Sequence, residues 1–550
     1  MRYYLDSSRS LRLFILAILP GIGAFARPAL ADDPTVYKIH NRWLSTEYLA
    51  AGNGKVIYSA GDDANFHWTL QDVHGLARIE NLGTHEYMIV APGSTDVTLA
   101  KTAPADVSGL WDITVGVAPW SSIKNQGNGK FLNCEHKLGY VQCDSDKVPN
   151  GDDFWSGQWE LVYVSGPKPA RHFKNHEIAV VSPAYCADVQ GDVKIEFIAP
   201  GFSKATAKCW KQGDGMGTDS TVADVALNDK GEGSFVFPGE KYPHGPVVVR
   251  ISAEDGATKD NCYLQLYNKG GVSWNEGLPK DPPPAAKGLT LLFADDFTGP
   301  LSISSTDPKA TYFDHKPLGG DFSTLQFTGH DEPKNPFLQV DTYLRIRADA
   351  KKKSSGLISS LNNDGKGIKA SAPCYFECRF LGPNAIGTWP AFWLMTDYPT
   401  ARKAQHLKDS PSDELDIIEA YGGEGPHHPN AFDKYMITPH AWDQGAAGKA
   451  AESKAFADMH NPISMNKAGI SSTWYETFHT YGCLVTDTET IYYCDNIEVG
   501  RHKTLDLSKK QPLFFMINLA TGGGWPVDLS RYDGVADMYV DYVRVFEGKR

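Results

Sequence analysis

The chain has 550 residues, 41% of them hydrophobic and 22% charged, so it can bury several cores and is too long for one ordinary domain. Its formal net charge of −13 argues against nucleic acid or an anionic membrane as the main partner. The 52 glycines, 34 prolines and 11% aromatic residues, with few helical runs, favour an all-β protein.

The N-terminus has the pattern of an export signal. Three arginines precede an apolar run at 13–26, and Ala29-Leu30-Ala31 is a small-residue cleavage site. The apolar run is short and is interrupted by Pro20-Gly21, so a membrane anchor is the weaker alternative. We therefore expect residues 1–31 to be a signal peptide. The mature protein would be secreted (periplasmic in a Gram-negative source) and free of the membrane.

Export makes the nine cysteines candidates for disulfides. Cys134 and Cys143 flank one expected turn, and Cys483 and Cys494 flank another. Each pair is either a disulfide across a hairpin or two small buried thiols. The odd total requires at least one free thiol.

A threefold repeat occupies residues 34–165. The motif Ile-x-Asn recurs three times, and each unit closes on Trp-x-Leu or Trp-x-Ile, at residues 68–70, 111–113 and 159–161. Three similar units of short strands can bury their faces by packing together. The segment resembles a β-trefoil of the ricin-type lectin kind, in which the repeated tryptophan is mainly core. Only Gln158-Trp159 approaches that family's Gln-x-Trp signature, so sugar binding is an expectation from fold resemblance.

Residues 170–276 show a second pattern. Short alternating runs at 193–198 and 247–251 are separated by Gly, Asp and Pro turns, which predicts an immunoglobulin-like β-sandwich. Its role would be that of a spacer or an accessory binding module. Residues 277–287 contain three consecutive prolines and predict a stiff linker.

The remaining residues, 288–550, suit a two-sheet β-jelly-roll sandwich. Their most informative segment is an acidic strand, Asp413-Glu414-Leu415-Asp416-Ile417-Ile418-Glu419-Ala420. In a regular strand Glu414 and Asp416 share one face, whereas Glu419 would point into the core. A β-bulge at Ile417-Ile418 would return Glu419 to the face of the other two acids.

Crowded carboxylates raise one another's pKa, so one acid can stay protonated while another is ionised. Glycoside cleavage needs that division between a proton donor and an anionic carboxylate. In retaining enzymes the two carboxyls lie about 5–5.5 Å apart. The alternative is a solvated acidic strand or a calcium-binding edge.

Two tryptophans precede the acidic strand. In Trp389-Pro390-Ala391-Phe392-Trp393 the indoles of Trp389 and Trp393 share a strand face with only Ala391 between them. On an exposed concave face they would form a stacking platform for sugar rings, and otherwise they fill the core.

The acidic strand and the tryptophan motif together resemble glycoside hydrolase family 16, in the bulged Glu-x-Asp-x-x-Glu form of laminarinase-like enzymes. The resemblance covers nearly all of 288–550. It implies that Glu414 is the nucleophile and Glu419 the general acid/base, with Asp416 orienting Glu414 and tuning its charge.

Further residues are assigned by the same resemblance. His440 and Trp442 would reach the cleft from the next strand, although a structural histidine is nearly as good an explanation of His440. The loop at 522–526 resembles a cleft rim, which makes Trp525 a substrate-binding candidate. Asp541 would ligate a structural calcium found in many relatives, or is only a surface charge.

The sequence thus predicts a secreted, monomeric, retaining endo-β-glycanase that acts on a β-linked polysaccharide and needs no cofactor. The substrate expected is β-1,3- or mixed β-1,3/1,4-glucan. The alternatives are a galactan hydrolase (agar, carrageenan or porphyran), a transglycosylase of the same family, and a non-catalytic glycan-binding protein.

Overall fold

The computed structural model describes residues 34–549 except 45, 74–75, 116–119, 150–153, 167–175, 257, 272, 406–410, 424–433, 460 and 524–526. The predicted signal peptide and Trp525 therefore lie outside the described residues. Strands dominate, and the described chain has only two α-helices, α1 (Tyr398–Gln405) and α2 (Gly445–Ala457), so the all-β prediction is confirmed. Neither is long and apolar enough to cross a membrane.

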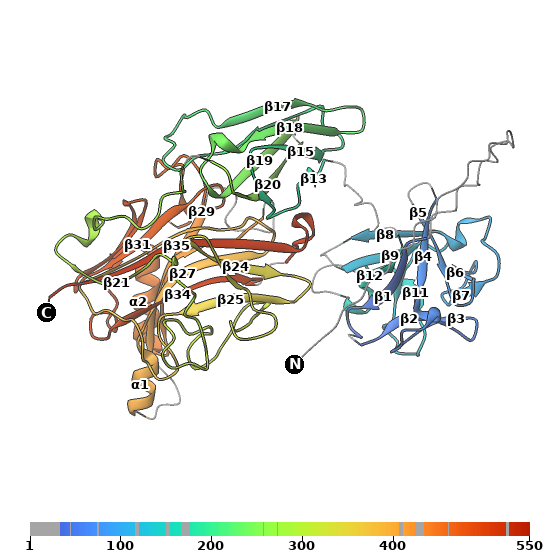
Figure 1. The fold of residues 1–550 in the computed structure, drawn as a ribbon. Coiled ribbons are helices and arrows are strands. Elements are labelled where there is room, and N and C mark those ends of the chain that lie inside the picture. Colours follow the sequence, from blue (N-terminus) through green and yellow to red (C-terminus); the bar gives the residue numbers. More distant parts are fainter. Residues whose placement is uncertain are drawn as a thin grey trace, which may run out of the picture.

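The N-terminal module contains twelve strands (Figure 1). Six of them close a ring in the order β1-β4-β5-β8-β9-β12, and β12 pairs back to β1. The hairpins β2–β3, β6–β7 and β10–β11 complete the three units. The strands are β1 (Val36–Asn41), β2 (Tyr48–Gly52), β3 (Lys55–Ser59), β4 (Trp68–Val73), β5 (Leu76–Asn81), β6 (Tyr87–Val90), β7 (Val97–Ala100), β8 (Trp111–Val115), β9 (Trp120–Asn125), β10 (Phe131–Asn133), β11 (Gln142–Ser145) and β12 (Trp159–Ser165).

The repeated residues do the same work in each unit. The three tryptophans are fully buried, and each indole N–H donates to a backbone carbonyl 3.0 Å away: Trp68 to Leu49, Trp111 to Met88 and Trp159 to Leu132. The buried asparagine of each Ile-x-Asn motif accepts two backbone N–H groups of the turn that follows it. The tryptophans are core residues, as expected. One cluster, drawn only from this module, buries them.

The middle module is a pair of sheets, one of three strands (β13-β15-β18) and one of five (β14-β20-β19-β16-β17). Buried and exposed residues alternate along strands such as β18, so each sheet turns one face inward. The strands are β13 (Ala179–Ser182), β14 (Asp188–Val189), β15 (Asp192–Ile198), β16 (Lys204–Lys208), β17 (Thr221–Ala226), β18 (Glu232–Pro238), β19 (Gly245–Asp255) and β20 (Thr258–Asn268).

The C-terminal module is the expected two-layered jelly roll (Figure 1). One layer contains β29-β28-β27-β34-β25 and the other β24-β35-β26-β31-β32-β33. They are linked where β24 pairs β25 through Asp349 and Ser354. The strands are β21 (Thr290–Asp295), β22 (Gln326–Phe327), β23 (Phe337–Val340), β24 (Tyr343–Asp349), β25 (Ser354–Ser359), β26 (Cys374–Leu381), β27 (Thr388–Thr396), β28 (Ser412–Glu419), β29 (Lys434–Trp442), β30 (Ile463–Ser464), β31 (His479–Val485), β32 (Glu489–Cys494), β33 (Ile497–Lys503), β34 (Leu513–Thr521) and β35 (Val535–Glu547).

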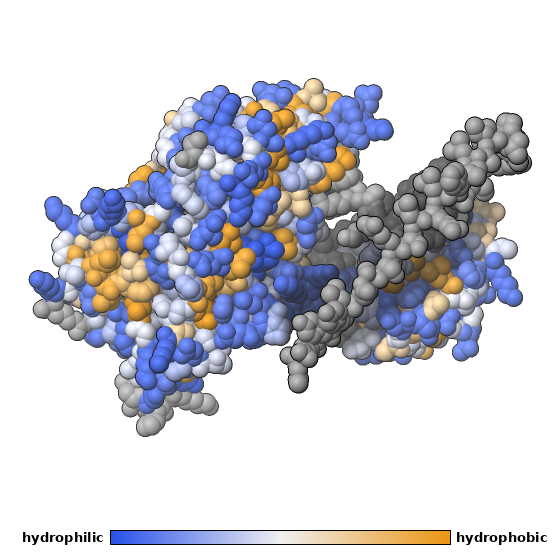
Figure 2. Space-filling view, in the orientation of Figure 1, coloured by the Kyte–Doolittle hydropathy of each residue, from blue (hydrophilic) through white to orange (hydrophobic). Residues whose placement is uncertain are grey.

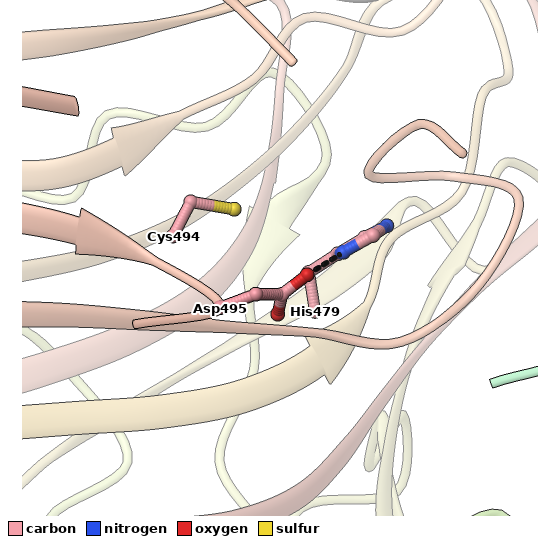
Figure 3. Close-up of side chains that lie close together, drawn as sticks. All are labelled: His479, Cys494 and Asp495. Carbon is pink, nitrogen blue, oxygen red and sulfur yellow. Dashed lines mark hydrogen bonds and ion pairs between the residues drawn. The ribbon is translucent and has the colours of Figure 1, made fainter. Parts of the chain in front are cut away.

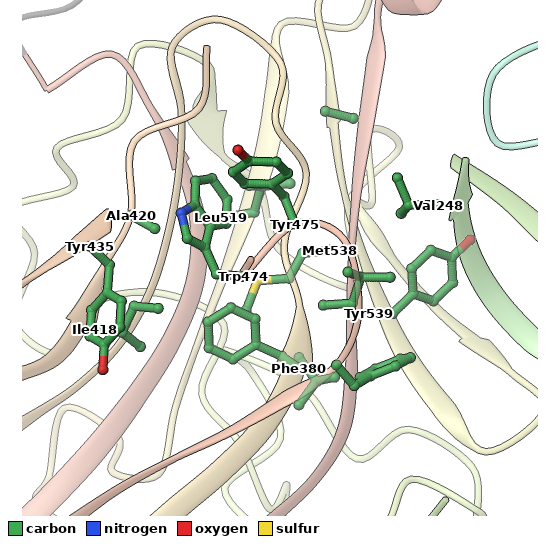
Figure 4. Close-up of a cluster of buried hydrophobic side chains, with 14 of the residues drawn as sticks. Val248, Phe380, Ile418, Ala420, Tyr435, Trp474, Tyr475, Leu519, Met538 and Tyr539 are labelled. Atoms are coloured by element: carbon green, nitrogen blue, oxygen red, sulfur yellow. The ribbon is translucent and has the colours of Figure 1, made fainter. Parts of the chain in front are cut away.

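The middle module shares a hydrophobic core with the jelly roll. Val248 of β19 and Tyr539 of β35 belong to one buried cluster (Figure 4). The Tyr263 ring meets Tyr475 edge-on with centroids 4.8 Å apart, and Arg250 pairs with Glu476 at 2.7 Å. This packing makes the middle module a fixed part of the C-terminal unit and argues against a freely moving spacer.

The proline-rich linker is also held against the jelly roll. The Arg544 guanidinium donates to the backbone carbonyls of Pro279 and Asp281, and Ala286 is buried against Tyr375 and Phe546.

On the face seen in Figure 2, apolar side chains gather in small patches among polar ones.

All nine cysteines are free thiols, so the proposed hairpin disulfides are wrong. Cys483 pairs with Tyr492 across β31 and β32, while Cys494 pairs with Tyr481. The turn lies between Thr486 and Glu489, one residue earlier than a Cys483–Cys494 bridge would require. The two thiols therefore do not face each other.

Candidate active site

The acidic strand β28 lies between β27 and β29. Leu415, Ile417 and Ile418 enter the core between the two layers. On β27, Phe392 and Leu394 also enter this core, while Ala391, Trp393 and Met395 belong to a separate cluster on the opposite face. The sheet thus turns a second face away from the core, and this face carries the candidate site.

The predicted β-bulge is present. The register of β28 shifts between Asp416 and Glu419 against β29, and between Phe392 and Trp393 against β27. Across β27, Glu414 lies opposite Met395, Asp416 opposite Trp393, and Glu419 opposite Ala391. Directly opposed residues of an antiparallel pair share a face, so the three acids and the tryptophan motif line one surface.

Each acid has its own hydrogen-bond or ion-pair partners. Glu414 Oε2 accepts the indole N–H of Trp442 at 3.1 Å. Glu419 accepts the Thr438 hydroxyl at 2.9 Å and the Tyr421 hydroxyl at 3.4 Å. The Asp416 carboxylate lies 3.6 Å from His440 Nε2.

These surroundings affect the pKa values of Asp416 and Glu414 differently. Burial, followed by the charges of Glu419 and Glu414, raises the pKa of Asp416 well above its ordinary value. Burial also raises the pKa of Glu414, against the opposing effects of His440, Lys316 and the Trp442 hydrogen bond. Burial and the neighbouring charges thus favour the protonated form of Asp416, whereas at Glu414 the effect of burial is opposed by His440, Lys316 and the Trp442 hydrogen bond.

The tryptophans differ from one another in accessibility. Trp393 is only 4% exposed and donates its indole N–H to Asn518, so it belongs to the floor of the site and is not an open platform. Trp389 is partly buried and stacks on Tyr421 with centroids 5.4 Å apart. Trp442 is 46% exposed and stacks on His440 at 4.9 Å. Trp442 therefore presents the most accessible indole of the three.

A cavity of about 320 Å³ is lined in part by Lys316, Tyr398, Arg402 and Trp442, and the indole N–H of Trp442 connects it to Glu414. Two of the residues that line the cavity, Lys316 and Arg402, are cationic. The Lys316 ammonium lies 5.6 Å from the centre of the Trp393 ring.

Sequence reasoning missed several residues of this surface. Lys316 and Phe322 come from the segment before β22, and Phe322 packs on both Trp389 and Trp393. Tyr421 follows the acids directly, and its aromatic ring two residues after Glu419 was the one local signal available. Nothing in the sequence near Lys316 or Phe322 indicated the site.

Asp541 does not lie at the surface. It is 1% exposed, and its carboxylate is paired with the equally buried Arg379. Within the described chain, two groups of side chains are close enough to hold an ion, and Asp541 belongs to neither. The structure thus gives Asp541 a buried cationic partner, and its role as a calcium ligand stays a prediction.

One of these two groups is Glu414, Asp416 and His440 of the site itself; the other is His479, Cys494 and Asp495. Figure 3 shows the Asp495 carboxylate against the His479 ring, 2.7 Å from Nδ1, with the Cys494 thiol set apart from the pair. Ser472 meets the other ring nitrogen at 3.2 Å. His479 is thus hydrogen-bonded through both ring nitrogens within the core.

Comparison with known proteins gives relatives by sequence and neighbours by structure. No family model matches the sequence. The chain is 26% identical over 284 residues to the endo-1,3-1,4-beta-glycanase EglC of Rhizobium meliloti, covering 47% of this chain and 52% of that protein. It is 29% identical over 177 residues to the endo-1,3-1,4-beta-glycanase ExsH of the same organism, covering 31% and 30%.

A laminarinase from Flavobacterium sp. UMI-01 superposes with a TM-score of 0.33 at 22% identity, covering 47% of this chain and 100% of that one. The chain spans about half, or less, of the length of the curated relatives it matches.

Proposed function

We propose that the protein is a retaining endo-β-glycanase that hydrolyses β-1,3- or mixed β-1,3/1,4-glucan. The observation that carries the proposal is the bulge of β28, with which Glu414, Asp416 and Glu419 share one face of the sheet with Trp389 and Trp393. The curated relatives, named as endo-1,3-1,4-beta-glycanases and a beta-glucanase, support both the class of reaction and the substrate.

In the first step, ionised Glu414 attacks the anomeric carbon and a carboxylate–carbon bond forms. The bond from that carbon to the glycosidic oxygen breaks, and its electron pair passes to the leaving oxygen, which takes a proton from Glu419. Glu419 then removes a proton from water, whose oxygen attacks the same carbon and releases Glu414. The hydrogen bond from Trp442 and the charge of Lys316 favour the anionic form of Glu414 that the attack requires, and they oppose the effect of burial.

Substrate binding is assigned to the aromatic residues of the same face. The exposed ring of Trp442 offers a stacking surface, and Trp389 a partly buried one, while Trp393 and Phe322 shape the floor. The cavity lined by Lys316 and Trp442 has room for sugar units on the Trp442 side of the acids.

The test is reducing-end release by the wild-type protein and by Glu414→Gln on laminarin, lichenan, agarose and carrageenan. We expect activity on the two glucans, abolished by the substitution while the thermal unfolding transition persists. Proton NMR of the first product should show the β-anomer. Cleavage of agarose or carrageenan alone would favour a galactan hydrolase, and chain lengthening a transglycosylase. An unchanged Glu414→Gln variant would refute the assignment of the nucleophile.

We further propose that residues 34–165 are a β-trefoil with a lectin-like role. The ring of six strands, the three hairpins and the equivalent buried tryptophans support this fold. The exposed side chains of Trp43 and Trp155, each beside a cation, are candidate glycan contacts. Loss of binding to insoluble glucan in a chain lacking this module, with activity on soluble glucan kept, would support the role.

The middle module is proposed to be immunoglobulin-like, on the strength of its two packed sheets. Export through cleavage of residues 1–31 and a monomeric state complete the proposal. N-terminal sequencing of the secreted protein and light scattering of the purified protein test them.

A further inference from the structure

Helix α2 follows β29 and lies against the edge of the candidate site. Its first turn is fastened to the acidic strand, because Gln444 donates its side-chain amide to the Ser412 carbonyl at 3.0 Å and to the Asp413 carboxylate at 2.7 Å. A Cβ at Gly448 would meet Gln444 Cβ at 2.4 Å and Ala441 Cβ at 3.4 Å. The helix therefore approaches β29 closely and is held in a defined register to β28.

In this position of the helix, Glu452 lies on the side of His440 that faces away from Asp416. Residues 444, 448 and 452 are spaced four apart, so they lie along one side of the helix. Glu452 Oε2 accepts the backbone N–H of Ala441 at 2.8 Å, and Oε1 lies 3.7 Å from His440 Nδ1. The carboxylate is thus fixed by one oxygen and turned toward the imidazole by the other.

His440 is consequently placed between two carboxyl groups. Its Nδ1 faces Glu452, and its Nε2 faces Asp416 at 3.6 Å. The ring stacks on Trp442, which donates to Glu414. Contacts of this length in a substrate-free site commonly shorten when substrate binds.

We propose that Glu452 is a positioning residue that acts through His440. By accepting from Nδ1–H it selects one tautomer and leaves the Nε2 lone pair directed at Asp416. Protonated Asp416 can then donate its O–H to Nε2. This hydrogen bond holds the Asp416 proton in one orientation, toward His440, when it could otherwise also point toward Glu419. This inference rests on the proposed function and adds a residue, on a helix, to which sequence reasoning assigned no role.

The charged groups around the imidazole are Asp416 and Glu414 from β28 and Glu452 from α2, with Lys316 beside both β28 acids. Glu452 is the member of this set that contacts only the far side of the ring. Its removal should therefore disturb the orientation of His440 without removing a group that meets the sugar.

The kinetic test is a double-mutant cycle on the full chain with Glu452→Ala, His440→Ala and the combined variant. Glu452→Ala should lower kcat by about 10- to 100-fold with KM nearly unchanged. In the His440→Ala background it should change kcat by no more than about twofold. Glu452→Gln should recover part of the activity, since its single amide oxygen can still accept the Nδ1–H of His440 in place of one of the two carboxylate oxygens. Lys449→Ala, on the exposed side of the same helix, is the control.

A second readout does not depend on activity. Nitrogen-15 correlation spectra of histidine-labelled protein, with His440 assigned by its absence in His440→Ala, should show the Nδ1–H tautomer in the wild type and a changed tautomer in Glu452→Ala. The proposal is overturned if the tautomer is the same in both proteins, if the two losses in kcat multiply, or if Glu452→Gln is as impaired as Glu452→Ala. A protein inactive on every glycan would sink the proposed function, while the spectra would still decide the role of Glu452.

Discussion

The hydrogen bond from Trp442 to Glu414 makes a sharp prediction about pH dependence. Replacing Trp442 by Phe keeps an aromatic ring beside His440 but removes the indole N–H, 3.1 Å from Glu414 Oε2. A hydrogen bond to a charged group contributes about 1.5–3 kcal/mol. Because Trp442 is 46% exposed, solvent screening reduces this to about 1 kcal/mol.

The sign follows from the role of Glu414. The bond favours the ionised carboxylate and opposes the effect of burial, so its loss raises the pKa of Glu414 further. An energy of about 1 kcal/mol moves the acidic limb of the kcat/KM profile upward by about 0.7 pH unit. Activity should fall at acidic pH and approach the wild-type value well above the limb.

The assay is reducing-end release from laminarin across the pH range, fitted for kcat/KM, which reports the free enzyme. Trp274→Phe, at a tryptophan that is 45% exposed and has no proposed role in glycan binding, is the matched control and should leave the profile in place. An acidic limb that stays where it is, or moves to lower pH in Trp442→Phe, would refute the reasoning.

Three further predictions concern stability. Asp416→Asn should raise the free energy of unfolding by about 1–2 kcal/mol at neutral pH while lowering activity. The folded state favours protonated Asp416, so the wild type loses stability as pH rises above the unfolded-state pKa of this group. The stability gained by Asp416→Asn, measured by urea titration, should therefore shrink toward pH 4. A stability gain that grows toward acidic pH would contradict the argument. Arg379→Met should cost about 3–5 kcal/mol, because it leaves buried Asp541 unpaired, whereas exposed Arg501→Met should cost much less; equal costs would count against it. Reducing agent should leave the melting temperature unchanged and thiol reagents should label the buried cysteines only after denaturation; a lowered melting temperature would reveal a disulfide.

Much of the acidic strand could be predicted from the sequence because the information there is local. Strand residues alternate between two faces, and a single extra residue reverses the alternation, so the order of acids and isoleucines predicted both the bulge and its position. The register of β28 against β27 and β29 has the expected shift. The shared face of Trp389 and Trp393 was predicted by the same argument.

Other features depended on contacts that no local pattern encodes. Trp393 is covered because Phe322, about seventy positions earlier, packs against it. Asp541 lies on β35, whereas its ion-pair partner Arg379 lies on β26, far away in the sequence. The residues next to Asp541 in the sequence therefore give no sign of this pair. A disulfide between Cys483 and Cys494 requires a turn centred one residue later than the observed one. That difference shifts every residue pair between β31 and β32, so the two cysteines are not opposite each other.

By itself, the sequence determined which segments become strands, which face each side chain takes, and which acids meet on β28. The period of a strand is a property of the backbone, and residues a few positions apart suffice to read it. Only the tertiary structure decided what stands opposite those faces: Lys316 beside Glu414, Glu452 behind His440, and the middle module packed on the jelly roll. These contacts join segments far apart in the chain, and the packing of whole layers, which no single segment specifies, brings them together.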